Sequence, residues 1–230
     1  MLRILSAGAG KAAVRALARD FERATGARVD ARFDAAGASR SAFEQDRNAD
    51  LVILPDAMLE ALAASNRVDR STFAPLGVVA TGVAVREGDV SPCIGDADAL
   101  RDALVAAPAL YCPDTVRSTA GGHFMRVLTM LGIDKSSKAK LRAYANGAAA
   151  MAELAQERRA GALGCTQVTE IRYTPGVTLV AALPAPFELS TRYALAVATD
   201  APSRELARAF AARLAGEEAT RLRRDGGFDV

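Results

Sequence analysis

Residues 2–21 constrain the fold more than any other stretch of this sequence. Residues 2–6 are an apolar run typical of a short buried strand, and residues 12–23 repeat apolar side chains at the three- and four-residue spacing of an amphipathic helix. The joint between them, residues 7–10, reads Ala-Gly-Ala-Gly. Backbone can approach a ligand closely there, and the free N–H groups of the first helical turn favour an anion or a polar oxygen. A tight turn without a ligand is the alternative.

The alternation of strand and helix continues down the chain. Residues 28–34 alternate like a strand, the small residues 35–39 predict a loop, and a short helix is expected at 41–47. The continuous apolar run 50–54 predicts a strand buried on both faces, as in parallel sheets, and residues 55–64 predict a helix. The sequence therefore predicts an α/β fold, with mixed, mainly parallel sheets flanked by helices. Ligands of such sheets bind beyond the carboxyl ends of the strands.

A second α/β unit is predicted in the middle of the chain. Two β-rich segments, 78–85 and 192–198, mirror each other as an outgoing and a returning crossing. We therefore predict two lobes, residues 1–79 with 193–230 and residues 80–192. The second lobe is expected to hold helices at 98–106, 123–131 and 148–159 and strands at 109–112, 162–167 and 177–183, with a loop at 113–122, and the chain to close with helices at 203–214 and 217–225.

The composition argues against several classes of function. The net charge is +2, from 29 Lys and Arg against 27 Asp and Glu, and aromatic residues make up 5% with no Trp, so we expect no nucleic-acid partner. No run approaches the ~18 apolar residues of a membrane span, so the chain is not expected to be membrane-embedded. Cys93, Cys112 and Cys165 are scattered, which fits reduced, mostly buried thiols better than disulfides or a zinc site. We expect neither a metal nor a cofactor.

Residues 8–13, Gly-Ala-Gly-Lys-Ala-Ala, match a dinucleotide-binding fingerprint with Ala in the third glycine position. Asp34 ends the next predicted strand, somewhat later than the acid of that motif is expected. A nucleotide-dependent α/β enzyme is the alternative function that this motif predicts. A Walker P-loop is excluded, because Leu5 stands where its first glycine is required and Ala12 where it needs Ser or Thr.

Residues 117–124 predict a second anion cradle. They place Arg117, the hydroxyls of Ser118 and Thr119, and the only histidine, His123, at another predicted helix start. Capping of that helix by Ser118 or Thr119 is the alternative. No sequence neighbour makes His123 part of a nucleophilic pair, and no Ser or Cys stands in a nucleophile-elbow context. We expect no enzymatic activity.

Several of these segments, in this order, resemble one family. They are the strand-loop-helix at 2–21, Phe33–Gly37, Asn48–Asp56, Ala120–His123 and Leu163-Gly164. Together they resemble the molybdate-binding family of ABC-transporter substrate-binding proteins over nearly the full length. The resemblance implies a two-lobed, type II periplasmic-binding-protein fold whose lobes close on a small anion in the cleft between them. The two hinge crossings would lie near 79–84 and 193–197.

The same resemblance implies a location and a partner. It implies a periplasmic protein if a signal peptide was removed, and an ABC-transporter permease as partner. The visible start reads as a first strand, because Arg3 and Lys11 interrupt any apolar signal region, so a chain that starts natively here is expected to be cytoplasmic.

The residues that hold the oxyanion in that family differ in this chain. The family uses two serines, a backbone N–H after the third strand, a backbone N–H at a helix start of the second lobe, and a tyrosine. The matching positions are Ala9, Ala36, Pro55, Ala149 and Gln167. This chain therefore lacks two of the family's ligand hydroxyls and, at Pro55, one N–H donor. Each oxygen of a bound oxyanion that is left without a donor costs binding free energy. We therefore favour a partly organic anion that is larger than molybdate, such as a small carboxylate, over molybdate or another oxyanion.

The predicted function is thus a small-anion solute-binding protein, either a transporter component or a related sensor. A scaffold that has lost its ligand is the third alternative. The predicted ligand-binding residues are Ser6, Gly8, Ala9, Ala36, Gly37, Arg117, Ser118, Thr119, His123, Ala149 and Gln167, with Asp34 also expected to line the cleft.

Overall fold

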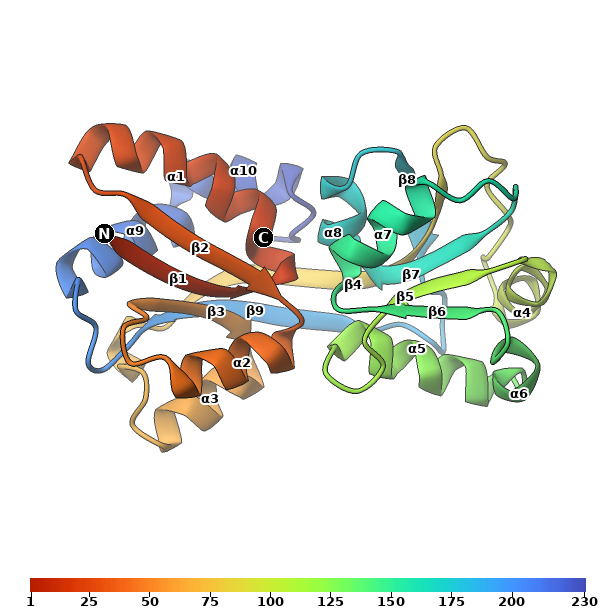
Figure 1. Ribbon diagram of the computed structural model, residues 1–230, viewed down its shortest axis with the longest axis horizontal. Coiled ribbons are helices and arrows are strands. Elements are labelled where there is room, and N and C mark those ends of the chain that lie inside the picture. The colour runs from red at the N-terminus through yellow and green to blue at the C-terminus, as the bar shows by residue number, and fades with distance from the viewer. The chain divides into compact units, whose positions relative to one another are not determined.

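The polypeptide divides into two structural units, which the computed structural model describes over residues 1–230 (Figure 1). Unit 1 comprises Met1–Val79 and Thr191–Val230, and unit 2 comprises Ala80–Ser190. The chain passes from unit 1 to unit 2 within β4 (Ala74–Arg86) and returns at the start of β9 (Ser190–Val197). No helix is both long and apolar enough to cross a membrane.

Unit 1 is built on a sheet with the strand order β2-β1-β3-β9-β4. β1, β2 and β3 are parallel, and β9 pairs with β3 in the antiparallel sense. Every residue of β3 is buried, which confirms the strand predicted from the apolar run at 50–54. The bounds of the first three strands are Leu2–Ala7 for β1, Val29–Asp34 for β2 and Leu51–Pro55 for β3.

Helices cover both faces of the unit 1 sheet (Figure 1). One face carries α1, whose Phe21 ring packs edge-on against Phe210 of α9 with the centroids 5.1 Å apart. Gly26 ends α1 in the left-handed region at φ 69°, which glycine adopts without strain. The helix bounds are Lys11–Thr25 for α1, Ala36–Gln45 for α2, Asp56–Ala64 for α3, Arg204–Ala215 for α9 and Thr220–Asp225 for α10, with short 3-10 turns at Gly8–Gly10, Arg70–Thr72 and Glu217–Ala219.

Unit 2 has a mixed sheet in which β8 and β4 are antiparallel neighbours, β4 pairs antiparallel with β7, and β7, β5 and β6 are parallel. Separate apolar clusters fill its two sides, one with α4 and α5 and the other with α7 and α8. The strand bounds are Leu110–Pro113 for β5, Leu141–Tyr144 for β6, Leu163–Gln167 for β7 and Val177–Ala182 for β8; the helix bounds are Ala97–Ala106 for α4, Thr119–Met130 for α5, Asp134–Ser137 for α6, Gly147–Ala155 for α7 and Val168–Tyr173 for α8.

The α/β architecture with mixed, mainly parallel sheets is confirmed, but two predicted loops were wrong. Residues 35–39 are not a loop, because α2 begins at Ala36, and alanine favours a helix intrinsically. Residues 113–122 are not all loop either, because Ser118 caps α5 and the helix begins at Thr119. A Cβ on Gly121 would collide with the carbonyl oxygen of Asp114, so this glycine serves close packing inside the helix.

Three short elements were not predicted at all, namely β6, α6 and α8. They contain four, four and six residues, too few to show the periodicity on which a sequence-based assignment depends. The helix predicted at 148–159 ends earlier, at Ala155.

Candidate functional site

In unit 1 the carboxyl ends of the parallel strands lie at one edge of the sheet. Ser6 of β1 is in register with Phe33 of β2 and Ile53 of β3. The 3-10 turn Gly8–Gly10 and the first turn of α2 therefore follow neighbouring strands. We call this region the carboxyl edge of unit 1. Parallel α/β sheets bind ligands at such an edge.

The polar groups predicted at this edge are largely bonded within unit 1. Ser6 is fully buried, and its Oγ donates to the carbonyl oxygen of Ala7 at 2.8 Å. Ser39 Oγ donates to the carbonyl oxygen of Ser6 at 2.8 Å, and Asp34 Oδ1 accepts from the N–H of Ala35 at 2.8 Å. The predicted ligand residues Gly8, Ala9, Ala36 and Gly37 lie in the two turns and have no polar side-chain atoms.

Gly10 has a structural reason to be glycine. A Cβ there would lie 2.6 Å from Ser6 Oγ and 3.3 Å from Ile53 Cγ2. The close approach of this turn to β1 and β3 therefore accounts for the second glycine of the dinucleotide-like motif. No nucleotide is needed to explain it.

Unit 1 also has buried side-chain atoms without a hydrogen-bond partner, among them one atom each of Asp56 and Thr191. Asp56 Oδ1 lies in the first residue of α3, directly after β3, and Thr191 Oγ1 lies near the start of β9. The other carboxylate oxygen of Asp56, Oδ2, lies 3.6 Å from Arg192 Nε. An unpaired carboxylate oxygen accepts hydrogen bonds and repels anions, so Asp56 does not favour an anionic solute.

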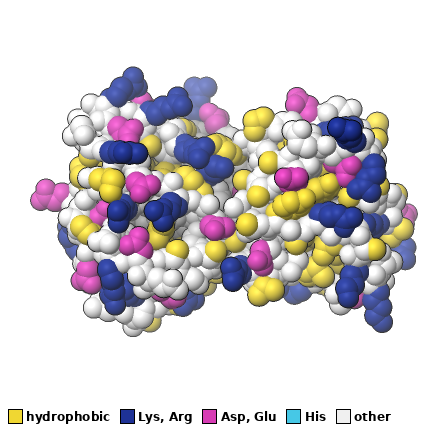
Figure 2. All heavy atoms as spheres, viewed as in Figure 1, with side chains coloured by type: hydrophobic (Ala, Val, Ile, Leu, Met, Phe, Trp, Pro, Cys, Tyr) yellow, Lys and Arg dark blue, Asp and Glu magenta, His cyan; other side chains and the backbone are white.

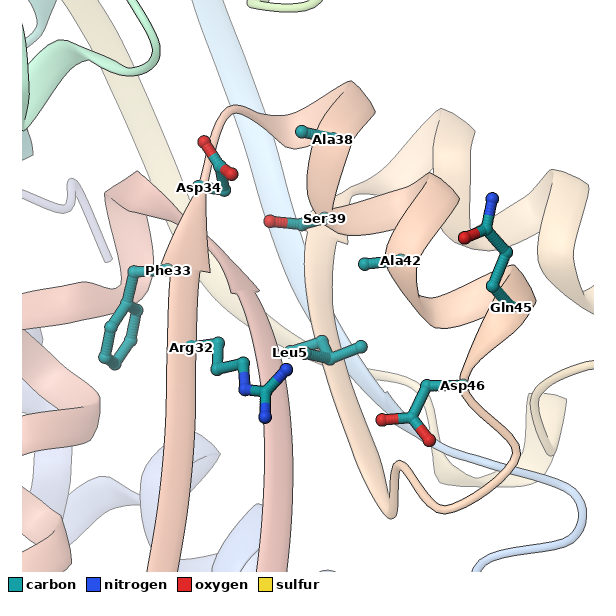
Figure 3. Close-up of a pocket in the computed structure, with 9 residues that line it drawn as sticks. All are labelled: Leu5, Arg32, Phe33, Asp34, Ala38, Ser39, Ala42, Gln45 and Asp46. Atoms are coloured by element: carbon teal, nitrogen blue, oxygen red, sulfur yellow. The ribbon is translucent and has the colours of Figure 1, made fainter.

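A groove of about 520 Å³ lies between the edge strand β2 and α2 (Figure 3). Asp34 lies at one end of this groove, Asp46 at the other, and the Arg32 side chain between them. One cation beside two carboxylates gives the groove no net attraction for an anion. Its lining residues are Leu5, Arg32, Phe33, Asp34, Ala38, Ser39, Ala42, Gln45 and Asp46.

In unit 2, the corresponding edge contains an uncompensated polar cluster. Gln167 ends β7 and is only 4% exposed, yet neither its Nε2 nor its Oε1 has a hydrogen-bond partner. Thr81 stands directly opposite Gln167 on β4, and Thr169 follows in α8; both are 1% exposed and both hydroxyls lack a partner. Opposite side chains of paired strands share one face of the sheet. We call Gln167, Thr81 and Thr169 the Gln167 cluster.

The amino end of α7, where Ala149 was predicted to offer its N–H, is engaged internally. The N–H of Ala149 donates to Oδ1 of Asn146, the N-cap residue, at 2.9 Å. Glu170 is 6% exposed, and its Oε2 accepts from Thr166 Oγ1 at 2.6 Å. A Cβ on Gly147 would collide with that same Oε2, so the carboxylate packs directly against the first turn of α7.

N–H groups at and just before the start of α5 are hydrogen-bonded to side chains of the same segment. Ser118 Oγ accepts from the N–H of Gly121 at 3.3 Å, so the capping alternative is confirmed for Ser118. Asp114 Oδ1 accepts from the N–H groups of Arg117 and Val116, each at 2.8 Å, and these bonds hold the pKa of Asp114 below its ordinary value. Arg117 is exposed and Thr119 is half-buried.

His123 does not lie at the helix start but in the second turn of α5. It is 9% exposed, and its Nε2 lies 2.7 Å from the carbonyl oxygen of Phe187, so Nε2 carries the proton in this bond. Arg126 Nη2 lies 3.5 Å from its Nδ1. The only histidine thus holds the segment around Phe187 against α5.

The cysteines are free thiols, with Cys112 and Cys165 buried and Cys93 exposed. Burial raises the pKa of the Cys112 thiol to about 12, which keeps it protonated and unreactive at neutral pH. No group of three or more His, Cys, Asp and Glu side chains is placed to hold a metal ion.

The sequence pointed to Gln167 and missed its neighbours. Thr81 is 86 positions away from Gln167, and only the pairing of β4 with β7 brings the two together. No short sequence pattern predicts that these two residues pair across the sheet. Asn146 and Gly147 did carry a signal, since Asn before a run of alanines is a typical helix N-cap. Glu170 lies in α8, which was not predicted.

Comparison with known proteins identifies the family. The chain belongs to the bacterial extracellular solute-binding proteins, whose family model matches residues 2–229. It is 29% identical to an aconitate isomerase of Pseudomonas sp. over 99% of this chain and 87% of that protein. The resemblance to the molybdate-binding family stated from the sequence is confirmed by this match and by the neighbours in structure.

Two solved structures show the fold. The periplasmic molybdate-binding protein of Azotobacter vinelandii superposes with a TM-score of 0.81 at 15% identity, over 100% of this chain and 99% of that one. The sulfate-binding protein SubI of Mycobacterium tuberculosis superposes with a TM-score of 0.73 at 17% identity, over 99% of this chain and 85% of that one. The predicted periplasmic-binding-protein fold is therefore confirmed.

Proposed function

We propose that this protein binds a small di- or tricarboxylate outside the cytoplasm and delivers it to an ABC-transporter permease. The observation that carries the proposal is the buried, unpartnered side-chain amide of Gln167. Leaving a buried polar group unpaired costs about 1–3 kcal/mol, so such a group in a folded protein calls for a partner. A bound solute supplies that partner.

The chemistry of the Gln167 cluster suits a carboxylate. Gln167 Nε2 has two N–H groups to donate, and the Thr81 and Thr169 hydroxyls donate one each. Gln167 Oε1 accepts, which suits a hydroxyl group or a protonated oxygen on the same solute. A carboxylate has two oxygens that need hydrogen-bond donors, whereas a tetrahedral oxyanion has four and must be surrounded by donors on all sides. A partly organic solute therefore fits better than molybdate.

The other predicted ligand residues take lesser roles in this proposal. Gly8, Ala9, Ala36 and Gly37 allow close approach without offering side-chain donors. Arg117 is exposed and offers its guanidinium to a carboxylate, and Thr119 offers a hydroxyl. Ser6, Ser118, His123 and the N–H of Ala149 are engaged in internal hydrogen bonds, so we propose that they support the site without contacting the solute.

A thermal-shift panel tests the proposal. The purified chain is melted with citrate, malate, succinate, cis- and trans-aconitate, sulfate and molybdate at constant ionic strength. A ligand at 100 times its Kd stabilises by about 2.7 kcal/mol, which a chain of this size shows clearly. We expect at least one carboxylate to raise Tm and sulfate and molybdate to leave it unchanged. A rise with molybdate alone contradicts the carboxylate assignment.

Isomerisation of an unsaturated tricarboxylate is the second candidate function. The 29% identity to an aconitate isomerase across 99% of this chain favours it. Moving the double bond requires a base that removes a proton from a methylene carbon and an acid that returns one to the former alkene carbon. Proton NMR of cis- or trans-aconitate in D₂O with the protein separates the candidates: a binding protein leaves the spectrum unchanged, whereas an isomerase interconverts the isomers.

A further inference from the structure

The carboxyl group of Glu170 lies at the amino end of α7. Glu170 is buried, its Oε2 is bonded to Thr166 Oγ1 at 2.6 Å, and that oxygen packs against Gly147 in the first turn of α7. The free N–H groups and the dipole of a helix start favour the ionised form of a carboxyl group placed there. Asn146 takes up the N–H of Ala149 at the same place.

We propose that the Glu170 carboxylate is a resident anion that determines specificity by excluding sulfate, molybdate and similar oxyanions from the amino end of α7. A tetrahedral oxyanion would meet a like charge there and would find the N–H of Ala149 already bonded to Asn146. A solute held by the Gln167 cluster does not need that N–H group. The inference rests on the proposed function in one respect, that unit 2 contributes to solute binding.

Gly147 is the residue that makes this arrangement sterically feasible. A Cβ at this position would collide with Glu170 Oε2 and with Thr166 Oγ1. Glycine in the first turn of a helix is otherwise a destabilising choice relative to alanine. Its presence here is explained by the approach of the carboxylate. Gly147→Ala therefore displaces the Glu170 carboxylate while leaving its charge in the chain.

The test compares two charge-neutralising variants in the full chain. Glu170→Gln keeps the shape and can still accept from Thr166. Glu153→Gln removes an exposed carboxylate from α7 itself and is the matched control. Sulfate and molybdate affinities are measured by calorimetry for both variants and the wild type, and Tm verifies folding. We expect Glu170→Gln to gain at least about tenfold in oxyanion affinity, a change of about 1.4 kcal/mol, and Glu153→Gln to match the wild type.

Equal oxyanion affinities in Glu170→Gln and the wild type overturn the inference, as does an equal gain in Glu153→Gln, which would indicate a general effect of charge. If Glu170→Gln does not fold, Gly147→Ala replaces it, and the same gain is expected because the carboxylate leaves the helix start. Carboxylate binding is measured in parallel. A wild type that binds no carboxylate while Glu170→Gln gains oxyanions refutes the proposed solute and leaves the role of Glu170 intact.

Discussion

The carboxyl edges of the two units share a strand-and-helix plan and differ in how their polar groups are satisfied. In unit 1, Ser6 and Ser39 donate to main-chain carbonyl oxygens, and Asp34 accepts from the neighbouring N–H. In unit 2, Gln167 and Thr81 are buried as deeply but keep unpaired donors. Gln167 and Thr81 therefore differ from Ser6 and Ser39 in hydrogen bonding and not in burial, which is why we propose that they contact the solute.

The two units also differ in how the carboxylates near these edges are placed. Unit 1 has an unpaired Asp56 oxygen near its edge and two aspartates beside Arg32 in its groove (Figure 3). Unit 2 holds its one buried carboxylate at this edge, Glu170, against a helix start and a hydroxyl. On the face of the molecule in Figure 2, basic and acidic side chains are interspersed over both units, so no broad patch of one charge overrides these local differences there. Specific donors, and not overall charge, are expected to recognise the solute.

Replacing Gln167 by methionine is expected to have the largest effect on binding. Gln167→Met keeps the length of the side chain and removes both its donors and its acceptor. A hydrogen bond to a charged group contributes about 1.5–3 kcal/mol, so affinity for the carboxylate identified in the thermal-shift panel should fall by about 10- to 150-fold. Because no protein partner is lost, Tm of the ligand-free protein should stay the same or rise. Calorimetry and thermal melting give the two values.

Gln156→Met is the control for this prediction. Gln156 follows α7 in the same unit and is exposed, so its replacement should change neither affinity nor Tm. A Gln167→Met protein that binds the solute as tightly as the wild type breaks the comparison between the units. So does a variant that loses several degrees of Tm without ligand, because the amide would then have a structural partner.

Ser39→Ala is expected to show the opposite result in unit 1. The substitution removes a buried bond to the carbonyl oxygen of Ser6 and should destabilise the fold by about 1–2 kcal/mol. Affinity should change less than about twofold, since this hydroxyl is committed internally. Urea unfolding and calorimetry measure the two quantities.

Arg32→Ala completes this test, because Ser39 and Arg32 both line the groove between β2 and α2. Arg32 is exposed, so its replacement should leave stability nearly unchanged. If both variants weaken solute binding, the groove of unit 1 is the binding site and the Gln167 cluster is not.

Sequence periodicity predicted the fold where apolar patterns were long or continuous. The buried strand β3 and the amphipathic helix α1 were visible in this way. The start of α5 was missed, because Gly121 and Gly122 suggest a loop while the Ser118 cap and the tight packing around Gly121 stabilise a helix. The short strand β6 lacked any usable pattern.

The site was less predictable, since it depends on pairs far apart in sequence. Gln167 was reached through a resemblance, but its lack of a partner can be seen only in three dimensions. His123 looked like a ligand because it was predicted to lie at a helix start beside the hydroxyls of Ser118 and Thr119, whereas the fold turns it toward Phe187. No sequence pattern pointed to Glu170, because its contact with Gly147 of α7 exists only in the folded structure.

The smallest expected effect concerns Asp114 and the loop that carries Arg117. The N–H groups of Arg117 and Val116 favour the ionised carboxylate, so its pKa in the folded protein lies below the value of 3.8 expected in the unfolded chain. Its contribution to stability is therefore complete above about pH 4 and is lost as pH falls through the lowered pKa. Asp114 is largely solvated, so this contribution should be below about 1 kcal/mol.

Asp114→Asn keeps the acceptor oxygen and removes the charge, so it isolates the ionic part of this loop's stability. We expect the variant to unfold at slightly lower urea concentration than the wild type at pH 7, and we expect this difference to shrink as the pH falls through the lowered pKa of Asp114. Asp102→Asn, an exposed change in α4, should show no such difference. A deficit that stays the same at every acidic pH at which the protein remains folded would assign the role of Asp114 to hydrogen-bond geometry alone. If Asp114→Asn binds the solute as tightly as the wild type, this loop belongs with the groups that are hydrogen-bonded within the fold, in contrast to the unpaired amide of Gln167.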